Sequence, residues 1–304
     1  MVRPARFGYN RQTAASNRFQ RAEPQSVDTA ARARGEFETL VLGLQGAGVG
    51  VCVVDDSAEP AKPDAVFPNN WVSFHADGTV VLYPMQAPNR REERRIEVLQ
   101  AVEARLHFRR SRLVDLRAHE DQGHMLEGTG SLVLDHVHRI AYACRSPRTD
   151  ESLVHKWSEL MNYDPLLFDA LGTDGTPIYH TNVLLSIGSK WAVVCADAIA
   201  GADCERVLRP LRDSGREIIE ISLKAMTRFA GNILELRGTD ASAGARSVLV
   251  LSETARTALQ QLYNKAWERL NDRVDQVVAA AIPTIESVGG GSVRCMLAEV
   301  PETQ

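Results

Sequence analysis

The sequence has little of what nucleic-acid-binding and membrane proteins need. Its 304 residues carry a formal net charge of -4, so it lacks the basic excess that a polyanionic partner demands. It contains no apolar run close to the roughly 18 residues that span a bilayer, and its opening MVRPARFGYN has no apolar stretch of the signal-peptide kind. We therefore expect a cytoplasmic protein with no nucleic-acid or membrane partner.

Cysteine is scarce, and its distribution argues against two kinds of structural site. The five cysteines are scattered, without a CxxC pair or a histidine at metal-ligand spacing: Cys52, Cys144, Cys195, Cys204 and Cys295. An odd number of isolated cysteines does not suit a disulfide framework. The pattern predicts neither disulfides nor a zinc site, and we expect no metal.

Long linkers are missing as well, and short strands alternate with helices along the chain. Strand-like runs occur at 49–54, 71–75, 79–84, 131–135, 139–144, 183–188, 191–196, 217–222 and 247–252. Helical spacing of apolar residues occurs at 28–46, 91–107, 150–162, 203–213 and 253–270. The hairpin-plus-helix pattern recurs about five times, and the stretches 56–64 and 238–245 have the length of surface loops. We therefore expect one domain over residues 1–304.

Three chemically capable side chains stand beside glycine-marked turns or hairpins. Cys295 follows a glycine triplet at 289–291, which would let backbone amides approach a ligand. Glu127 directly precedes Gly128, and His180 heads another hairpin. Each has a simpler interpretation: a small buried hydrophobe in a strand, a solvated turn residue and a structural histidine. Because a nucleophilic cysteine needs an imidazole, a positive charge or backbone amides nearby, the three together favour a catalytic group.

Four motifs, in this order, resemble a known family: FPNNW, EGTGS, YHTNV and GGGSVRCM. They are similar to motifs of the guanidino-group modifying enzymes, or pentein superfamily, and most similar to its amidinotransferase-like or citrulline-utilisation hydrolases, relatives of arginine deiminase and dimethylarginine dimethylaminohydrolase. The resemblance implies a single-domain, fivefold pseudosymmetric α/β propeller whose central channel holds the active site. It also implies that Cys295 is the nucleophile, His180 the general acid and base, and Glu127 its acidic partner, with no metal or organic cofactor.

The sequence departs from the arginine deiminase pattern at two positions that would bind the substrate. Where the resemblance implies carboxylates that grip a guanidinium, this chain has Asn70 and Asn182. A buried cation without its carboxylates is costly, whereas a neutral ureido group offers a carbonyl oxygen to an amide NH₂. These asparagines therefore favour a neutral substrate such as citrulline.

Arginine is the residue that matches an amino acid's carboxylate with two hydrogen bonds. Arg145 and Arg148, in CRSPRTD, lie where the resemblance implies a carboxylate-binding arginine, although solvated loop arginines are an equal alternative. Arg90 and Arg91 are weaker candidates. They open the mixed-charge stretch RREERR at 90–95, which we interpret as a solvated helix start.

The expected function is a cysteine-dependent C–N hydrolase that acts on a small-molecule amino acid. The most concrete reaction converts citrulline to ornithine, carbon dioxide and ammonia through a covalent S-carbamoyl intermediate. Alternatives are an amidinotransferase, in which an amine replaces water, an arginine deiminase or dimethylarginine hydrolase activity, and a propeller that binds without catalysis. The sequence leaves the oligomeric state open.

Overall fold

The four largest sheets of the computed structural model, which describes residues 1–23, 27–240 and 244–301, share one topology. In each, the first two strands form an antiparallel hairpin and the third lies parallel to the second. In chain order the strands are β3 (Val72–Phe74), β4 (Thr79–Leu82) and β5 (Arg112–Asp115); β6 (Val133–Asp135), β7 (Ile140–Cys144) and β8 (Asp164–Phe168); β9 (Leu185–Ile187), β10 (Trp191–Val194) and β11 (Glu217–Glu220); β12 (Leu234–Asp240), β13 (Gly244–Ser252) and β14 (Gln276–Ala280).

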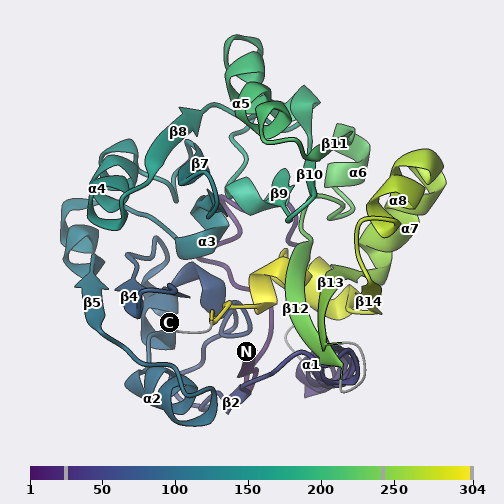
Figure 1. The fold of residues 1–304 in the computed structure, drawn as a ribbon. Helices are drawn as coiled ribbons and strands as arrows, with labels where there is room; N and C mark the ends of the chain where they lie inside the picture. Colours follow the sequence, from purple (N-terminus) through teal and green to yellow (C-terminus); the bar gives the residue numbers. More distant parts are fainter. Residues whose placement is uncertain (24–26, 241–243, 302–304) are drawn as a thin grey trace.

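Helices connect the second strand of each sheet to the third, as a parallel crossover requires. They are α2 (Ile96–Arg105), α4 (Glu151–Met161), α5 (Gly201–Asp213), and the pair α7 (Glu253–Leu262) and α8 (Asn264–Asn271). Local chemistry sets their ends: the Asp150 side chain accepts a hydrogen bond from the Leu153 amide at 3.2 Å, and Asn162 ends α4 in the left-handed conformation. Figure 1 shows these helices on the outside of the sheets.

A fifth, smaller unit closes the ring with elements from the start of the chain. It comprises the long helix α1 (Val27–Gly46) and a parallel pair of short strands, β1 (Val2–Arg3) and β2 (Val54–Asp55). Helix α1 packs against β14 of the fourth sheet, and Val2 of β1 shares a core cluster with Val98 of α2, so this unit lies between the fourth and the first (Figure 1). The expected arrangement of five units around a centre is therefore present.

Short helical turns precede the first strands and meet near the centre of the ring. They are η1 (Pro68–Asn70), α3 (Gly128–Ser131), η4 (Thr181–Val183) and, near the end of the chain, η7 (Val293–Met296). Turn η1 packs against α3 and η7, and α3 packs against η4. The remaining short helices are η2 (Pro88–Glu93), η3 (Arg117–Gln122), η5 (Ala196–Ala198), α6 (Leu223–Met226) and the π-helical η6 (Ile285–Gly289). The motifs EGTGS, YHTNV and FPNNW all fall on these central turns.

Several predicted elements need correction. The helix predicted over 253–270 divides into α7 and α8 at Tyr263, and the strand predicted over 49–54 is reduced to its last residue in β2. The helix predicted over 91–107 begins only at Ile96. The loop predicted over 238–245 instead extends β12 and β13, with residues 241–243 outside the described residues. Within the described ranges, no helix has the length and hydropathy of a membrane span.

Candidate active site

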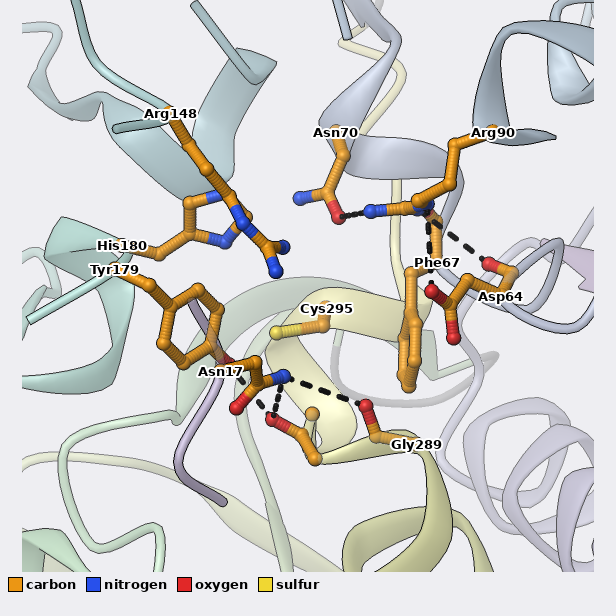
Figure 2. Close-up of a pocket in the computed structure, with 12 residues that line it drawn as sticks. Asn17, Asp64, Phe67, Asn70, Arg90, Arg148, Tyr179, His180, Gly289 and Cys295 are labelled. Atoms are coloured by element: carbon orange, nitrogen blue, oxygen red, sulfur yellow. Dashed lines mark hydrogen bonds and ion pairs between the residues drawn. The ribbon is translucent and has the colours of Figure 1, made fainter. Parts of the chain in front are cut away.

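One pocket, lined by residues from η1, η7 and the residues just before η4, gathers most of the predicted site residues (Figure 2). Cys295, His180, Asn70 and Arg148 all lie on its wall. The complete lining is Asn17, Asp64, Phe67, Asn70, Arg90, Arg148, Tyr179, His180, Gly289, Gly290, Gly291 and Cys295. The folded chain thus brings together side chains that are far apart in the sequence.

Cys295 lies on the helical turn η7, not on the strand suggested by SVRCMLAEV. The residue is 3% exposed, and its Sγ lies 3.4 Å from Asn232 Nδ2 and 3.7 Å from Asn182 Nδ2. Burial raises the pKa of the Cys295 thiol, and the hydrogen-bonding groups around it, including both asparagines, act in the opposite direction. The sulfur is therefore held by amide groups in a buried position.

The glycine triplet that precedes Cys295 is required by a close approach of the Phe67 ring. A Cβ atom on Gly289 would lie 2.9 Å from Phe67, and one on Gly291 would lie 3.0 Å from it. Gly290 has a φ of +66°, a conformation that side chains other than glycine rarely adopt. Its carbonyl oxygen accepts a hydrogen bond from the Tyr179 hydroxyl at 2.7 Å. The triplet thus permits two walls of the pocket to pack closely.

Glu127 and His180 form a buried pair beside the pocket. His180 Nε2 lies 2.9 Å from Glu127 Oε2, and the other carboxylate oxygen accepts a hydrogen bond from the Gln86 amide at 3.0 Å. Burial alone would raise the pKa of Glu127, but Arg148, His180 and Arg90 together lower it well below its usual range. Burial lowers the pKa of His180 to about 4. Near neutral pH the carboxylate is therefore ionised and the imidazole neutral, with its proton on Nε2, because a carboxylate can only accept.

Two buried arginines place positive charge around this carboxylate. Arg148 Nη1 lies 3.4 Å and Arg90 Nη1 3.8 Å from Glu127 Oε2. Arg90 is also paired with Glu93 through two contacts of 2.9 Å, and both residues are buried. The interpretation of RREERR as a solvated helix start is therefore wrong for these two residues, because the short turn η2 buries both of them, and Arg90 lines the pocket.

Asn70 has an amide orientation that Arg90 fixes. Arg90 Nη1 donates a hydrogen bond to Asn70 Oδ1 at 2.8 Å, so the oxygen faces the arginine (Figure 2). The amide nitrogen donates to Asn69 Oδ1 at 3.1 Å. A Cβ atom placed on Gly130 would lie 2.6 Å from this nitrogen and 2.6 Å from His180 Nδ1. Asn70 thus presents NH₂, a hydrogen-bond donor, on the side that faces the imidazole.

Asn182 lies against the sulfur and is not among the residues that line the pocket. Its Nδ2 and Oδ1 atoms are 3.7 and 3.9 Å from Cys295 Sγ. Asn232, which the sequence analysis did not select, is the sulfur's other amide neighbour. A sequence signal does exist, because GNIL at 231–234 repeats the Asn-apolar pattern of TNVL at 181–184, each at the start of the first strand of a sheet.

The two arginines of CRSPRTD lie in different places. Arg148 is buried and lines the pocket, where its guanidinium carbon lies 4.9 Å from the centre of the Tyr179 ring. Arg145 lies in a separate surface hollow and forms ion pairs with Glu151 at 2.8 Å and Asp169 at 3.5 Å. Arg91 is also outside the pocket and donates to the Met85 carbonyl. Of these three candidates, only Arg148 is placed to contact a ligand in the pocket.

A segment near the start of the chain, residues 9–21, packs against the pocket and was not predicted. Arg148 donates to the Thr13 carbonyl at 3.0 Å and to the Ser16 hydroxyl at 2.8 Å. Asn17 lines the pocket and donates to the Gly290 carbonyl at 3.1 Å. The sequence gives no periodic signal for this segment, because it contains neither a regular helix nor a strand.

Asp64 is a second pocket residue that the sequence analysis missed. It is 2% exposed, and its Oδ2 accepts hydrogen bonds from Asn10 at 2.8 Å and Thr13 at 3.2 Å. Its Oδ1 is buried without a hydrogen-bond partner among the residues that the structure describes, which is unusual for a carboxylate oxygen. Asp64 is the last residue of the stretch 56–64, which the sequence predicts to be a surface loop; this prediction is wrong for Lys62 and Asp64, which are both buried.

The chain was compared with known proteins. A family model described as N,N dimethylarginine dimethylhydrolase, eukaryotic, matches residues 3–302. The chain belongs to this family. It is thus a hydrolase of C–N bonds in the pentein superfamily, as the motifs suggested. No curated protein matches it at a significant level.

Solved structures of 16–17% sequence identity share the fold of this chain. The N-terminal domain of ArgZ, an arginine dihydrolase of cyanobacteria determined with bound substrate, aligns with a TM-score of 0.73 over 100% of this chain and 97% of its own. An AgrE variant in complex with L-arginine aligns with a TM-score of 0.74, but this chain covers only 40% of it. A dimethylarginine hydrolase (DDAH) variant from Pseudomonas aeruginosa, complexed with citrulline, aligns at 0.64 over 97% and 95% of the two chains. The predicted pentein fold is confirmed.

Proposed function

We propose that this member of the family hydrolyses citrulline to ornithine, carbon dioxide and ammonia, with Cys295 as nucleophile. The observation that carries the proposal is the orientation of Asn70. Because Arg90 holds the Asn70 oxygen, the NH₂ group is the part left to meet a substrate. A ureido oxygen can accept from that donor, whereas a guanidinium presents only N–H donors and would oppose it.

The proposed chemistry uses one covalent intermediate. The Cys295 thiol gives its proton to the neutral His180, and the sulfur attacks the ureido carbon. The bond from this carbon to the ornithine nitrogen breaks, and His180 returns the proton to that nitrogen. An S-carbamoyl group remains on Cys295, and water, deprotonated by His180, hydrolyses it to carbamate, which decomposes to carbon dioxide and ammonia. Glu127 keeps the imidazole oriented and stabilises its protonated form.

The amino-acid end of the substrate would be held by charges of both signs. Arg148 lies on the pocket wall and offers a guanidinium fork to a carboxylate. Asp64 Oδ1, which is buried and has no hydrogen-bond partner within the described part of the chain, would accept hydrogen bonds from the α-ammonium group. In this proposal, Arg145 no longer belongs to the residues that bind the substrate, and Asn182 contacts the Cys295 sulfur and not the substrate.

A guanidino substrate is the second candidate, because of the family's own name and because AgrE, which has the same fold, was crystallised with L-arginine. The buried carboxylates of Glu127 and Asp64 supply negative charge close to the pocket. Both candidates require the same nucleophile, so they differ only in how the reacting carbon is recognised.

Initial rates on citrulline, L-arginine and asymmetric dimethylarginine separate the two, with ornithine, citrulline and ammonia measured in each reaction. We expect citrulline to yield ornithine and ammonia in equal amounts, with a kcat/KM about a hundredfold above that for arginine. The Cys295→Ala variant provides the blank. Accumulation of citrulline from arginine, or equal rates on the two substrates, would contradict the citrulline assignment.

A further inference from the structure

The residues that line the pocket do not explain how the Cys295 thiolate is stabilised. The thiol is buried, which disfavours the thiolate that must attack the substrate. His180 can take the proton, but the negative charge that remains on sulfur needs donors of its own. Among the described residues, the side-chain hydrogen-bond contacts of Sγ are with two asparagine amides, Asn182 and Asn232.

Asn232 has an orientation that its backbone partners fix. Its Oδ1 accepts a hydrogen bond from the Arg294 amide at 3.1 Å, and its Nδ2 donates to the Asn182 carbonyl at 2.9 Å. If the amide oxygen and nitrogen of Asn232 were exchanged, the oxygen would face the Asn182 carbonyl oxygen and the NH₂ would face the Arg294 N–H. Both contacts are unfavourable, so the observed orientation is preferred. The second hydrogen of Nδ2 is then available to Cys295 Sγ, which lies 3.4 Å away. This is the shortest of the four asparagine–sulfur contacts.

The same side chain also ties together three parts of the site. It contacts Arg294, the residue before the nucleophile on η7; the backbone of Asn182 on η4; and the sulfur itself. Asn232 is fully buried and lies two residues before the start of β12. The fourth sheet therefore contributes to the site through this residue.

We propose that Asn232 is a positioning residue that holds Cys295 and stabilises its thiolate through a fixed N–H donor. The inference rests on the proposed function, since it takes Cys295 as the nucleophile. Titratable groups that line the pocket with the sulfur or adjoin it in the chain are Asp64, Arg90, Arg148, Tyr179, His180 and Arg294. None of these side chains has a hydrogen bond to Sγ in the described structure, so the amide donor acts on the sulfur most directly.

The test compares Asn232→Ala and Asn232→Asp with the wild type. Asp keeps an oxygen that can accept from Arg294, but it loses the donor and places negative charge beside the sulfur. Its effect on the thiolate must therefore exceed that of Ala. The primary measurement is the rate of Cys295 alkylation by iodoacetamide across pH, followed by mass spectrometry of the Cys295 peptide so that Cys204, which is partly exposed, does not interfere.

At about pH 7.5, we expect Cys295 to be alkylated fastest in the wild type, more slowly in Asn232→Ala and most slowly in Asn232→Asp. The rate for Asn232→Asp should be lower than the wild-type rate by about tenfold or more, and the midpoint of its pH profile should rise by about one pH unit or more. On citrulline, kcat should fall about tenfold or more while KM changes less than about threefold. Asn271→Asp, an equal change in charge on an exposed residue at the end of α8, should match the wild type in both assays.

Two results would overturn the proposal. Unchanged alkylation profiles in both variants would show that Asn232 does not act on the sulfur. Slower alkylation in both variants with no rise in the midpoint of the pH profile would indicate structural support without an effect on the thiolate. If Asn232→Asp fails to fold, the test rests on Asn232→Ala alone: a higher midpoint in its alkylation rate against pH supports the proposal, and an unchanged midpoint refutes it. Turnover by Cys295→Ala would instead refute the proposed function, which keeps the two failures distinct.

Discussion

Glu127 Oε2 lies 2.9 Å from His180 Nε2 and, at 3.4 and 3.8 Å, faces the guanidinium groups of Arg148 and Arg90. One buried oxygen is thus the shared anion of three basic side chains. Removing a partner from a buried ionic group leaves the others uncompensated, and this costs far more than losing a surface pair. The carboxylate therefore supports the fold as well as the proposed orientation of the imidazole.

Glu127→Gln should lower the free energy of unfolding by about 3–5 kcal/mol at neutral pH, because two buried arginines lose their common anion. Chemical denaturation of both proteins measures the difference. Since the folded-state pKa of Glu127 is lowered, its stabilisation is complete above the unfolded-state value of about 4.3 and is lost as the pH falls toward the folded-state value. The gap between wild type and variant should therefore narrow in acid.

The matched control is Glu151→Gln, which removes the exposed partner of Arg145. This pair is shorter, at 2.8 Å, but solvent screens it, so the control should unfold at the same denaturant concentration as the wild type. Equal effects of the two substitutions would mean that the charges around Glu127 do not form a coupled buried group.

Cys295→Ala should abolish turnover, reducing kcat by about a thousandfold or more, because no neighbouring group can form the covalent bond. The far-UV circular dichroism spectrum should be unchanged. In wild-type protein quenched during turnover, mass spectrometry should find the substrate-derived adduct on Cys295 alone among the five cysteines. An adduct on another cysteine, or residual full activity in the variant, would refute this assignment.

Arg148 and Arg145 offer a paired test, because they are three residues apart and only one lines the pocket. Arg148→Lys keeps the positive charge near Glu127 but loses the planar fork, so KM for citrulline should rise about tenfold or more with a smaller change in kcat. Arg145→Lys should change KM by less than about threefold. The reverse order would identify Arg145 as the substrate ligand and require the surface hollow to take part in binding.

Periodic features of the fold were predictable from sequence, since apolar spacing marks α1, α4 and α5 within one or two residues of their ends. The central turns were not, because η1, α3, η4 and η7 are only three or four residues long and have no period to detect. Only the four sequence motifs indicated where these turns lie in the chain. The split at Tyr263 also escaped, since α7 and α8 continue the same amphipathic spacing.

Within the candidate site, residues with reactive side chains were easier to predict than those that orient them. Cys295 follows a glycine triplet, Glu127 precedes a glycine and His180 heads a predicted hairpin, so all three attract attention; their roles stay predictions. Arg90 and Glu93 lie in a stretch with the composition of a solvated surface, and only the tertiary fold shows that their charges pair inside. Asp64 has an ordinary local sequence, and the local signal for Asn232 is limited to the resemblance of GNIL to TNVL. Both residues are distinguished by a contact with chain segments more than 50 residues away.

Asn70→Asp gives the most direct test of how substrate charge is recognised. The new carboxylate would still accept from Arg90, but its second oxygen would replace the NH₂ donor that faces His180. An anion there attracts a guanidinium and repels a ureido oxygen. We expect the ratio of kcat/KM for citrulline to that for arginine to fall about a hundredfold or more, measured as ornithine and ammonia release in parallel assays.

Asn182→Asp is the informative comparison, because that amide faces Cys295 Sγ at 3.7 Å and not the pocket. A carboxylate beside the sulfur disfavours the thiolate whatever the substrate, so both kcat/KM values should fall together and their ratio should stay constant. In the double variant, the ratio of kcat/KM for citrulline to that for arginine should therefore equal the ratio in Asn70→Asp. Both kcat/KM values should be lower than in Asn70→Asp. If Asn182→Asp shifts the ratio, Asn182 reads substrate charge after all, as its sequence position suggested. If Asn70→Asp leaves the ratio unchanged, the orientation imposed by Arg90 does not select the substrate, and the citrulline proposal loses the observation that carries it.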